Sequence, residues 1–156
     1  TVGTVTEIYD YLRLLYARVG KPHCYSCGRE VQKQSSEQIV DTILEKFDGQ
    51  RIIIMAPVIR GRKGHYRELL EDILKDGFVR ARIDGEIFEL DAEIKLDRYK
   101  LHDIEIVIDR IKVAEKSRFR ISESIDVALN YGNGNVYINE GKEDFVFSRN
   151  FACVHC

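Results

Sequence analysis

The stretch Arg51-Ile52-Ile53-Ile54-Met55-Ala56-Pro57 decides how the rest of the chain is interpreted. Five consecutive apolar residues lie in it, so an extended chain here has no polar side. This pattern predicts a strand that is buried on both faces, or close to it. Pro57 is predicted to close the strand, because proline has no N–H to donate to a sheet.

Segments with helical periodicity lie on both sides of this strand. Their apolar residues recur at spacings of three and four, which places them on one face of a helix. Four helices are therefore predicted, over residues 8–19, 35–47, 66–75 and 118–131. The first two begin with capping-box patterns, Thr4 with Glu7 and Ser35 with Gln38.

From Asp76-Gly77 onward, the spacing of apolar residues changes from 3.6 to 2. Asp84-Gly85 separates two alternating runs, which predicts a hairpin with a type I′ turn. A further strand is predicted over residues 101–113, and a last hairpin over residues 136–147. The predicted fold class is α+β, with a mixed or antiparallel sheet and several packed helices.

Length and charge exclude several classes of protein. The 156 residues are enough for one domain, or for one domain with a small satellite. With 24 basic and 26 acidic residues, the net charge of -2 gives no global attraction to nucleic acid. Apolar residues in periodic blocks argue against general disorder. No apolar run approaches the ~18 residues of a membrane-spanning helix, so no membrane association is predicted.

Two C-x-x-C pairs bracket the α+β part of the chain. They are Cys24 with Cys27 and Cys153 with Cys156. One C-x-x-C turn directs two thiolates at a single ion, and two such turns complete a tetrahedral zinc site. The sequence thus predicts one structural Zn²⁺ that staples the root of an insertion. Four thiolates would close the coordination shell and leave no open position for catalysis.

Other interpretations of the cysteines stay open at this point. Structural disulfides, a thioredoxin-type redox pair and cysteines that only fill a core each compete with zinc. His23 and His155 lie beside the pairs and are interpreted as bystanders. The predicted division is residues 1–28 for the first helix and knuckle, 29–150 for the α+β insertion, and 151–156 for the second knuckle. Because the chain starts without methionine and stops on Cys156, we expect a piece of a larger protein.

Two groups of basic residues are candidate binding sites. One is a flexible, glycine-flanked loop that is suited to phosphate contacts, or is simply an exposed, soluble loop; its residues are Arg60, Arg62, Lys63, His65 and Arg67. The other is Arg80 and Arg82 on one face of a strand, with Arg110 on a neighbouring strand after Asp109. Arginines on a rigid sheet are typical anchors for a protein partner, although ordinary solvated arginines have the same pattern.

The chemistry of an enzyme is not apparent. Gly61-Arg62-Lys63-Gly64 and Gly141-Lys142-Glu143 lack the spacing and residues of a phosphate-binding loop. The sequence shows neither a nucleophile elbow nor a metal-binding helix. We therefore predict that this chain has no catalytic activity by itself.

Several segments resemble the UvrA family, the damage-sensing ATPase subunits of bacterial nucleotide excision repair. The matching segments run in order through the whole chain: residues 1–15 (TVGTVTEIYDYLRLL), Ala56-Pro57 with the following Gly-Arg-Lys-Gly, residues 77–85 (GFVRARIDG), residues 107–110 (VIDR) and residues 151–156 (FACVHC). In that family the region is the UvrB-binding domain, inserted in the first ATPase half after its phosphate-binding loop. The resemblance implies a module that docks UvrB, so that damaged DNA is handed over.

The resemblance also implies further partners and a location. The transcription-repair coupling factor is expected to compete for the same surface. DNA and ATP are expected to bind the parent protein, a homodimer in the bacterial cytoplasm, and not this piece. For the zinc site, some relatives have Cys-x-x-His where this chain has Cys24 and Cys27. A further C-x-x-C follows downstream in the family, so Cys153 and Cys156 have two candidate partner pairs.

The resemblance carries the partner-binding role onto Arg80 and Arg110, and also onto Arg82 and Asp109. The alternative hypothesis, of another class, is a zinc-stapled module that binds nucleic acid through Arg60, Arg62, Lys63 and Arg67.

Overall fold

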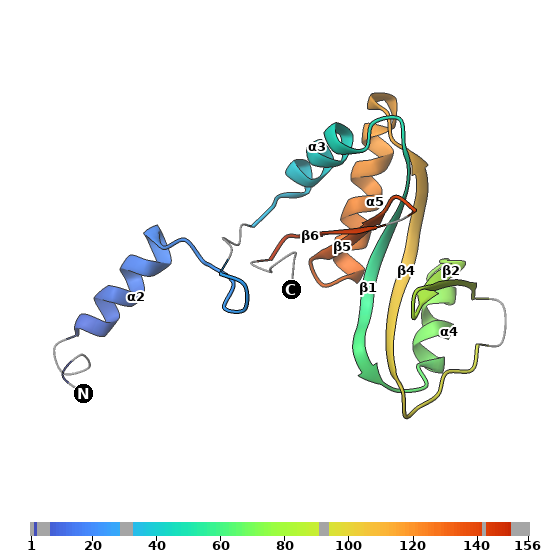
Figure 1. Ribbon diagram of the computed structural model, residues 1–156, viewed down its shortest axis with the longest axis horizontal. Coiled ribbons are helices and arrows are strands. Elements are labelled where there is room, and N and C mark those ends of the chain that lie inside the picture. The colour runs from blue at the N-terminus through green and yellow to red at the C-terminus, as the bar shows by residue number, and fades with distance from the viewer. Residues whose placement is uncertain (1, 3–6, 29–32, 91–93, 142, 151–156) are drawn as a thin grey trace.

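A six-stranded antiparallel sheet forms the centre of the structure, with the strand order β3-β2-β4-β1-β5-β6 (Figure 1). The computed structural model describes residues 2, 7–28, 33–90, 94–141 and 143–150. The strands are β1 (Arg51–Lys63), β2 (Arg80–Ile83), β3 (Glu86–Glu89), β4 (Leu101–Lys112), β5 (Asn135–Asn139) and β6 (Asp144–Ser148). Every neighbouring pair in this sheet is antiparallel. The α+β class is thus confirmed, and the mixed-sheet option is excluded for the described strands.

Helices occur where the periodicity predicts them. They are α2 (Ile8–Val19), α3 (Ser36–Lys46), α4 (Arg67–Lys75) and α5 (Arg118–Tyr131), with a 3₁₀ turn, η1 (Glu115–Ser117), before α5. The capping box of α3 is confirmed: the Gln38 amide donates to Ser35 Oγ at 3.2 Å, and the Ser35 amide donates to Gln38 Oε1 at 2.9 Å. None of the described helices is long and apolar enough to cross a bilayer.

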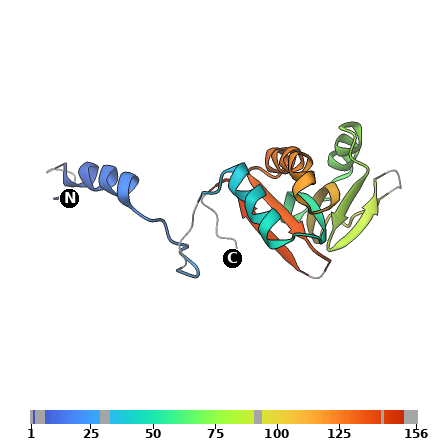
Figure 2. The ribbon, with the colours of Figure 1, turned by 90° about the horizontal axis from the view of Figure 1, so that it is seen from above.

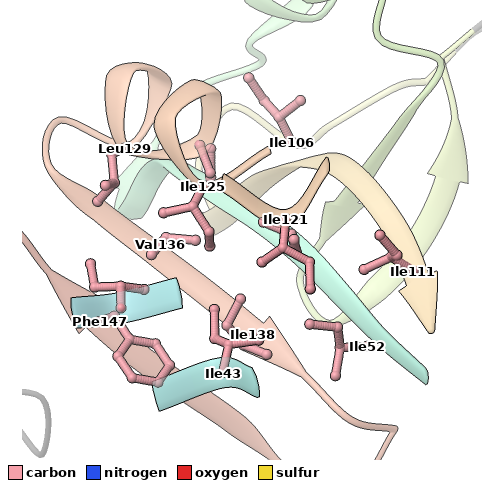
Figure 3. Close-up of a cluster of buried hydrophobic side chains, with 14 of the residues drawn as sticks. Ile43, Ile52, Ile106, Ile111, Ile121, Ile125, Leu129, Val136, Ile138 and Phe147 are labelled. Atoms are coloured by element: carbon pink, nitrogen blue, oxygen red, sulfur yellow. The ribbon is translucent and has the colours of Figure 1, made fainter. Parts of the chain in front are cut away.

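The main core lies between the sheet and three helices. Side chains of α3, α4 and α5 pack on one face of the sheet, where Ile52 and Ile54 of β1 lie between Ile104, Ile106 and Ile138 of the neighbouring strands. Figure 3 shows Ile43, Ile121 and Ile125 directed toward this layer. Burial of each such side chain contributes about 1.5–3 kcal/mol, so the helices are held to this face mainly by the hydrophobic effect.

Helix α2 stands apart from the sheet (Figures 1 and 2). It is amphipathic, but none of its residues is buried. Its apolar side chains Ile8, Leu12 and Leu15 are 51%, 44% and 54% exposed. Of the capping box predicted for it, Thr4 lies outside the described residues, and Glu7 makes no side-chain capping hydrogen bond. The predicted division at residues 28, 29 and 151 stays a prediction.

Strand β1 is longer than predicted, because Pro57 does not close it. The strand runs on to Lys63, and Pro57 is buried opposite Glu105 of β4. Pairing with β5 covers only Ile53–Met55. Pro57 therefore has β4 as its one paired neighbour in the described sheet, and register shifts follow it. A proline is tolerated at such a place, because no strand pairs with it on the β5 side and its missing N–H therefore breaks no hydrogen bond there.

The tight turn between β2 and β3 is anchored by a buried histidine. Asp84 and Gly85 have φ values of 52° and 92°, both positive, as the predicted type I′ turn requires. His102, which is 4% exposed, donates from Nδ1 to Asp84 Oδ2 at 2.7 Å and from Nε2 to the Asp97 carbonyl at 2.9 Å. Both ring nitrogens face acceptors, and this arrangement favours the doubly protonated, cationic form of the ring. The hydrogen bond to Asp84 raises the pKa of His102 above its ordinary value.

We predict that the free energy of unfolding falls as the pH rises from about 6.5, the ordinary histidine pKa, through the raised pKa of His102. Above that ordinary pKa the unfolded chain releases its proton first, so the stabilisation from the cationic ring is progressively lost. Urea unfolding of the wild type and of His102→Gln, from about pH 5.5 to about pH 8.5, measures this difference. Exposed His65 supplies the control variant His65→Gln. Equal pH slopes for the wild type and His102→Gln would contradict the prediction.

Candidate functional site

The face of the sheet opposite α3, α4 and α5 holds a second, smaller apolar cluster. Met55, Val107 and Tyr137 are buried there, with Ile53 and Val146 packed against them. We call this surface the open face, because the described helices that pack on the sheet all belong to the other core. Polar side chains border the cluster: the Arg60 guanidinium lies over the Tyr137 ring, 5.6 Å from its centroid.

An ion triad, in which Arg82 and Glu105 are buried and Asp144 is partly exposed, crosses the open face. Arg82 of β2 donates from Nε to Glu105 Oε2 of β4 at 3.1 Å and from Nη1 to Asp144 Oδ1 of β6 at 2.9 Å. The Arg82 and Glu105 side chains are only 12% and 7% exposed. Strands β2 and β6 are separated by three others in the sheet order. The triad is therefore a side-chain cross-link between strands that are not neighbours in the sheet.

The charges of the triad depend on one another. Burial raises the pKa of Glu105, and the hydrogen bond from Arg82 offsets only part of this effect. Burial also acts to raise the pKa of Asp144, but the bonds donated by Arg82 and by Asn139 Nδ2, at 2.7 Å, hold it below the ordinary value. Burial acts against the Arg82 cation, yet its two carboxylate partners keep its pKa raised. Arg82 thus balances two acids, of which Glu105 is 7% exposed and Asp144 is 34% exposed.

Arg80 and Arg110, the two main predicted partner contacts, both belong to the open face and are accessible. Arg80 alternates with core residue Ala81 and donates to Glu89 Oε1 of β3 at 3.1 Å, with its side chain 40% exposed. Arg110 is exposed and pairs in register with Ile53. Among the described residues, none forms a hydrogen bond or ion pair with the Arg110 guanidinium. The structure thus places both side chains where a partner can reach them.

A depression of about 400 Å³ lies beside Arg110. Its lining includes Arg51 and Lys112, which pair across β1 and β4, and Asn139 at the end of β5. Three cationic side chains, those of Arg51, Arg110 and Lys112, and one acidic residue, Glu140, therefore line a hollow at one end of the open face, so cations predominate there. Such a hollow suits a carboxylate-bearing segment of a partner better than a basic one.

Arg82 and Asp109, the other two predicted partner contacts, have internal partners. Arg82 is held in the triad. Asp109 lies on the helix-covered face, where it pairs with Arg120 of α5 at 2.7 Å and has a side chain that is 15% exposed. The structure thus brings Arg80, Arg82 and Arg110 to one face and places Asp109 on the other.

The basic residues predicted to form a flexible loop lie mostly in a strand. Arg60, Arg62 and Lys63 belong to β1, where Arg62 pairs with His102 and Lys63 with Leu101. The loop prediction is wrong because β4 is long enough to pair with this stretch and hold it extended. Of the other two, His65 lies between β1 and α4, and Arg67 lies in α4 and pairs with Glu71 at 2.9 Å.

The first cysteine knuckle forms a tight turn. The Gly28 amide donates to the Cys24 carbonyl at 2.8 Å; Cys24 is buried and Cys27 is exposed. This local geometry fits a C-x-x-C metal turn. Cys153 and Cys156 lie outside the described residues. Within the described part of the chain, three or more His, Cys, Asp or Glu side chains do not gather as a metal-binding group.

Sequence reasoning missed the two acids of the triad. One signal was present: Glu105 is the one polar residue in the run from Ile104 to Ile108, and a carboxylate in such a place needs a buried partner. Asp144 carried no comparable signal, because it follows a polar hairpin loop. Its contact with Arg82 joins residues 62 positions apart.

An open, arginine-bearing sheet face backed by three helices is typical of a small α+β interaction domain. Residues 34–142 match the family described as "UvrA interaction domain", and the chain belongs to this family. It is similar to UvrABC system protein A of Clostridium tetani (56% identical over 100% of this chain), Bacillus subtilis (54% over 100%) and Thermus thermophilus (49% over 98%). The chain spans about a sixth of the length of these relatives, between 16% and 17%.

We predict stability effects of different size for two arginines of the same strand. Arg82→Met leaves Glu105 buried without its cation, and this is expected to lower the free energy of unfolding by about 3 kcal/mol. Arg80→Met removes only an exposed ion pair, and the expected change is below about 1 kcal/mol. Urea unfolding at neutral pH measures both values. A smaller loss for Arg82→Met than for Arg80→Met would show that the triad does not stabilise the sheet.

Proposed function

We propose that this chain is the UvrB-docking module of a UvrA protein and that the open face is its docking surface. The observation that carries the proposal is the exposed Arg110 guanidinium, which stands on a rigid strand beside Ile53 and a cation-lined hollow. The family match supports it, since the matched region is described as an interaction domain of UvrA.

The physical chemistry of the open face favours a protein partner with acidic groups. Arginine makes bidentate bonds to carboxylates, and a strand holds it with little further loss of entropy on binding. The apolar residues Ile53 and Val146 beside the charges supply contact area that a phosphate backbone does not need. A mixed surface of this kind resembles the apolar centre and polar rim of protein interfaces.

In the parent protein, this module links damage sensing to the next step of nucleotide excision repair. The parent is proposed to be a dimeric, DNA-binding ATPase of the bacterial cytoplasm, with its nucleotide sites outside this chain. The module itself performs no catalysis; it holds UvrB so that damaged DNA is handed over. The transcription-repair coupling factor is proposed to compete for the same face.

Reversal of both exposed arginines is expected to weaken UvrB binding. Arg80→Glu with Arg110→Glu places like charges against the partner's acidic groups. We expect a loss of at least about 30-fold in affinity, equivalent to about 2 kcal/mol. Isothermal titration of this chain with purified UvrB measures the loss.

The matched control reverses two arginines away from the open face, Arg67→Glu with Arg118→Glu. Both are exposed and belong to the helical layer, so UvrB affinity is expected to stay within about threefold of the wild type. Unchanged affinity for the Arg80 and Arg110 variant would remove those residues from the docking site. Duplex DNA binding that falls steeply with salt would instead favour the nucleic-acid alternative through Arg60, Arg62, Lys63 and Arg67.

We also propose that Cys24 and Cys27 hold a structural Zn²⁺ together with Cys153 and Cys156. The tight turn between Cys24 and Gly28 supports this proposal, because two cysteines of a C-x-x-C metal site stand on such a turn. When bound, zinc would tie the entry of the α+β part to its exit and restrict the unfolded chain.

Metal analysis of protein purified under reducing conditions is expected to find about one zinc per chain. Cys24→Ser with Cys27→Ser is expected to lose the metal, because only two thiolates remain. His23→Ala, the control, changes a neighbouring residue and is expected to retain it. Absence of zinc from the wild-type chain would contradict this proposal.

A further inference from the structure

A β-bulge in β4 decides which face of the sheet receives Arg110. Met55 of β1 pairs with Val107, and the preceding residue, Ile54, pairs with Asp109. Ile108 is therefore an extra residue in β4 without a counterpart in β1. A bulge of this kind changes the alternation of side chains between the two faces.

The faces on either side of the bulge follow from the pairing. Ile54 belongs to the helix-side core and Ile53 to the open-face cluster. Their partners share those faces, so Asp109 lies on the helix side and Arg110 on the open face. If side chains alternated strictly along β4 from Val107, with no bulge, Asp109 would lie on the open face and Arg110 on the helix side. The docking arginine is thus presented to a partner only because the bulge exists.

Asp109 is bound on the helix side by several donors. Arg120 of α5 donates to it from Nε at 2.8 Å and from Nη2 at 2.7 Å, and Ser124 Oγ donates at 3.2 Å. The backbone amide of Arg110 donates to Asp109 Oδ1 at 2.7 Å. One carboxylate therefore connects helix α5 to the backbone of the docking arginine.

We propose that Asp109 is a positioning residue, which fixes the bulge against α5 and so directs Arg110 to the open face. This inference rests on the proposed docking function, and it replaces a direct partner contact for Asp109. Burial by itself would raise the pKa of Asp109, but the bonds from Arg120 and the Arg110 amide outweigh burial and hold the pKa below its ordinary value. The carboxylate is therefore charged at neutral pH, as its role as a fixed acceptor requires.

The first test needs no partner. Hydrogen exchange at the Arg110 amide is expected to accelerate at least about tenfold in Asp109→Ala, because that amide loses its acceptor. Asp109→Asn keeps an acceptor oxygen and is expected to restore most of the protection. Asp126→Ala is the control, since Asp126 lies in α5, like Arg120, and forms an exposed ion pair with Arg149. Unchanged exchange in Asp109→Ala would overturn the inference.

The second test separates positioning from a general loss of stability. Asp109→Ala is expected to lower UvrB affinity by about as much as Arg110→Ala, and the double variant by no more than either one. Losses that add would overturn the inference, since they would show that Asp109 acts independently of Arg110. If Arg110→Ala leaves the affinity unchanged, the proposed docking function fails, while the exchange experiment still decides the role of Asp109.

A second variant covers the case in which Asp109→Ala does not fold. Arg120→Gln removes the ion pair from the solvent side, where the Arg120 side chain is 63% exposed. It is expected to accelerate exchange at the Arg110 amide and to lower UvrB affinity, as Asp109→Ala does, but by smaller factors. A folded Arg120→Gln protein with wild-type exchange and wild-type affinity would overturn the inference.

Discussion

The pairing of β1 with β4 is the contact on which the rest of the structure depends. These two long strands pair from Arg51 with Lys112 to Lys63 with Leu101. The other strands attach to them, β2 and β3 beside β4, and β5 and β6 beside β1. Because side chains alternate between faces, this ladder sets which residues meet the helices and which form the open face. Its register shifts, the bulge at Ile108 among them, are the places where that assignment changes.

The arginines of the open face divide into two kinds by environment. Arg82 is enclosed by two carboxylates and cross-links β2, β4 and β6. Arg80 and Arg110 remain exposed, one with a solvated acid beside it and the other next to the cation-lined hollow. A buried cation shapes the surface, whereas exposed cations are available to a partner at a smaller desolvation cost.

The helix layer contributes to the open face from behind the sheet. Helix α5 packs on the core through Ile121 and Ile125, and it presents Arg120 to the bulged part of β4. The exposed arginines that are proposed to meet a partner are thus supported by a packed core and by a charged contact between α5 and β4. Such preorganisation reduces the entropy lost on binding, which is a general route to affinity without a large interface.

Local features of the sequence were sufficient to predict the four helices and both hairpins, nearly to the residue. Helical periodicity, the Ser35 capping box and the Asp84-Gly85 turn each act over a few residues, so they can be recognised without the fold. Pro57 was misjudged, because its place in the strand depends on the small extent of pairing with β5. The sequence predicts a loop at residues 60–63, because the strand that pairs with this stretch lies about 40 residues away.

For the candidate site, too, local sequence patterns predict one part and contacts between distant strands determine the rest. The alternation at Arg80 and Arg82 predicts that both lie on one face, and the resemblance to UvrA implies a partner-binding role that stays a prediction. Only the tertiary structure separated them, since burial of Arg82 requires Glu105 and Asp144 from distant strands. The sequence by itself therefore determined the elements and the arginines available to a partner. The tertiary structure decided which of them stay exposed and on which face, because long-range strand pairing and its bulge set every side chain's direction.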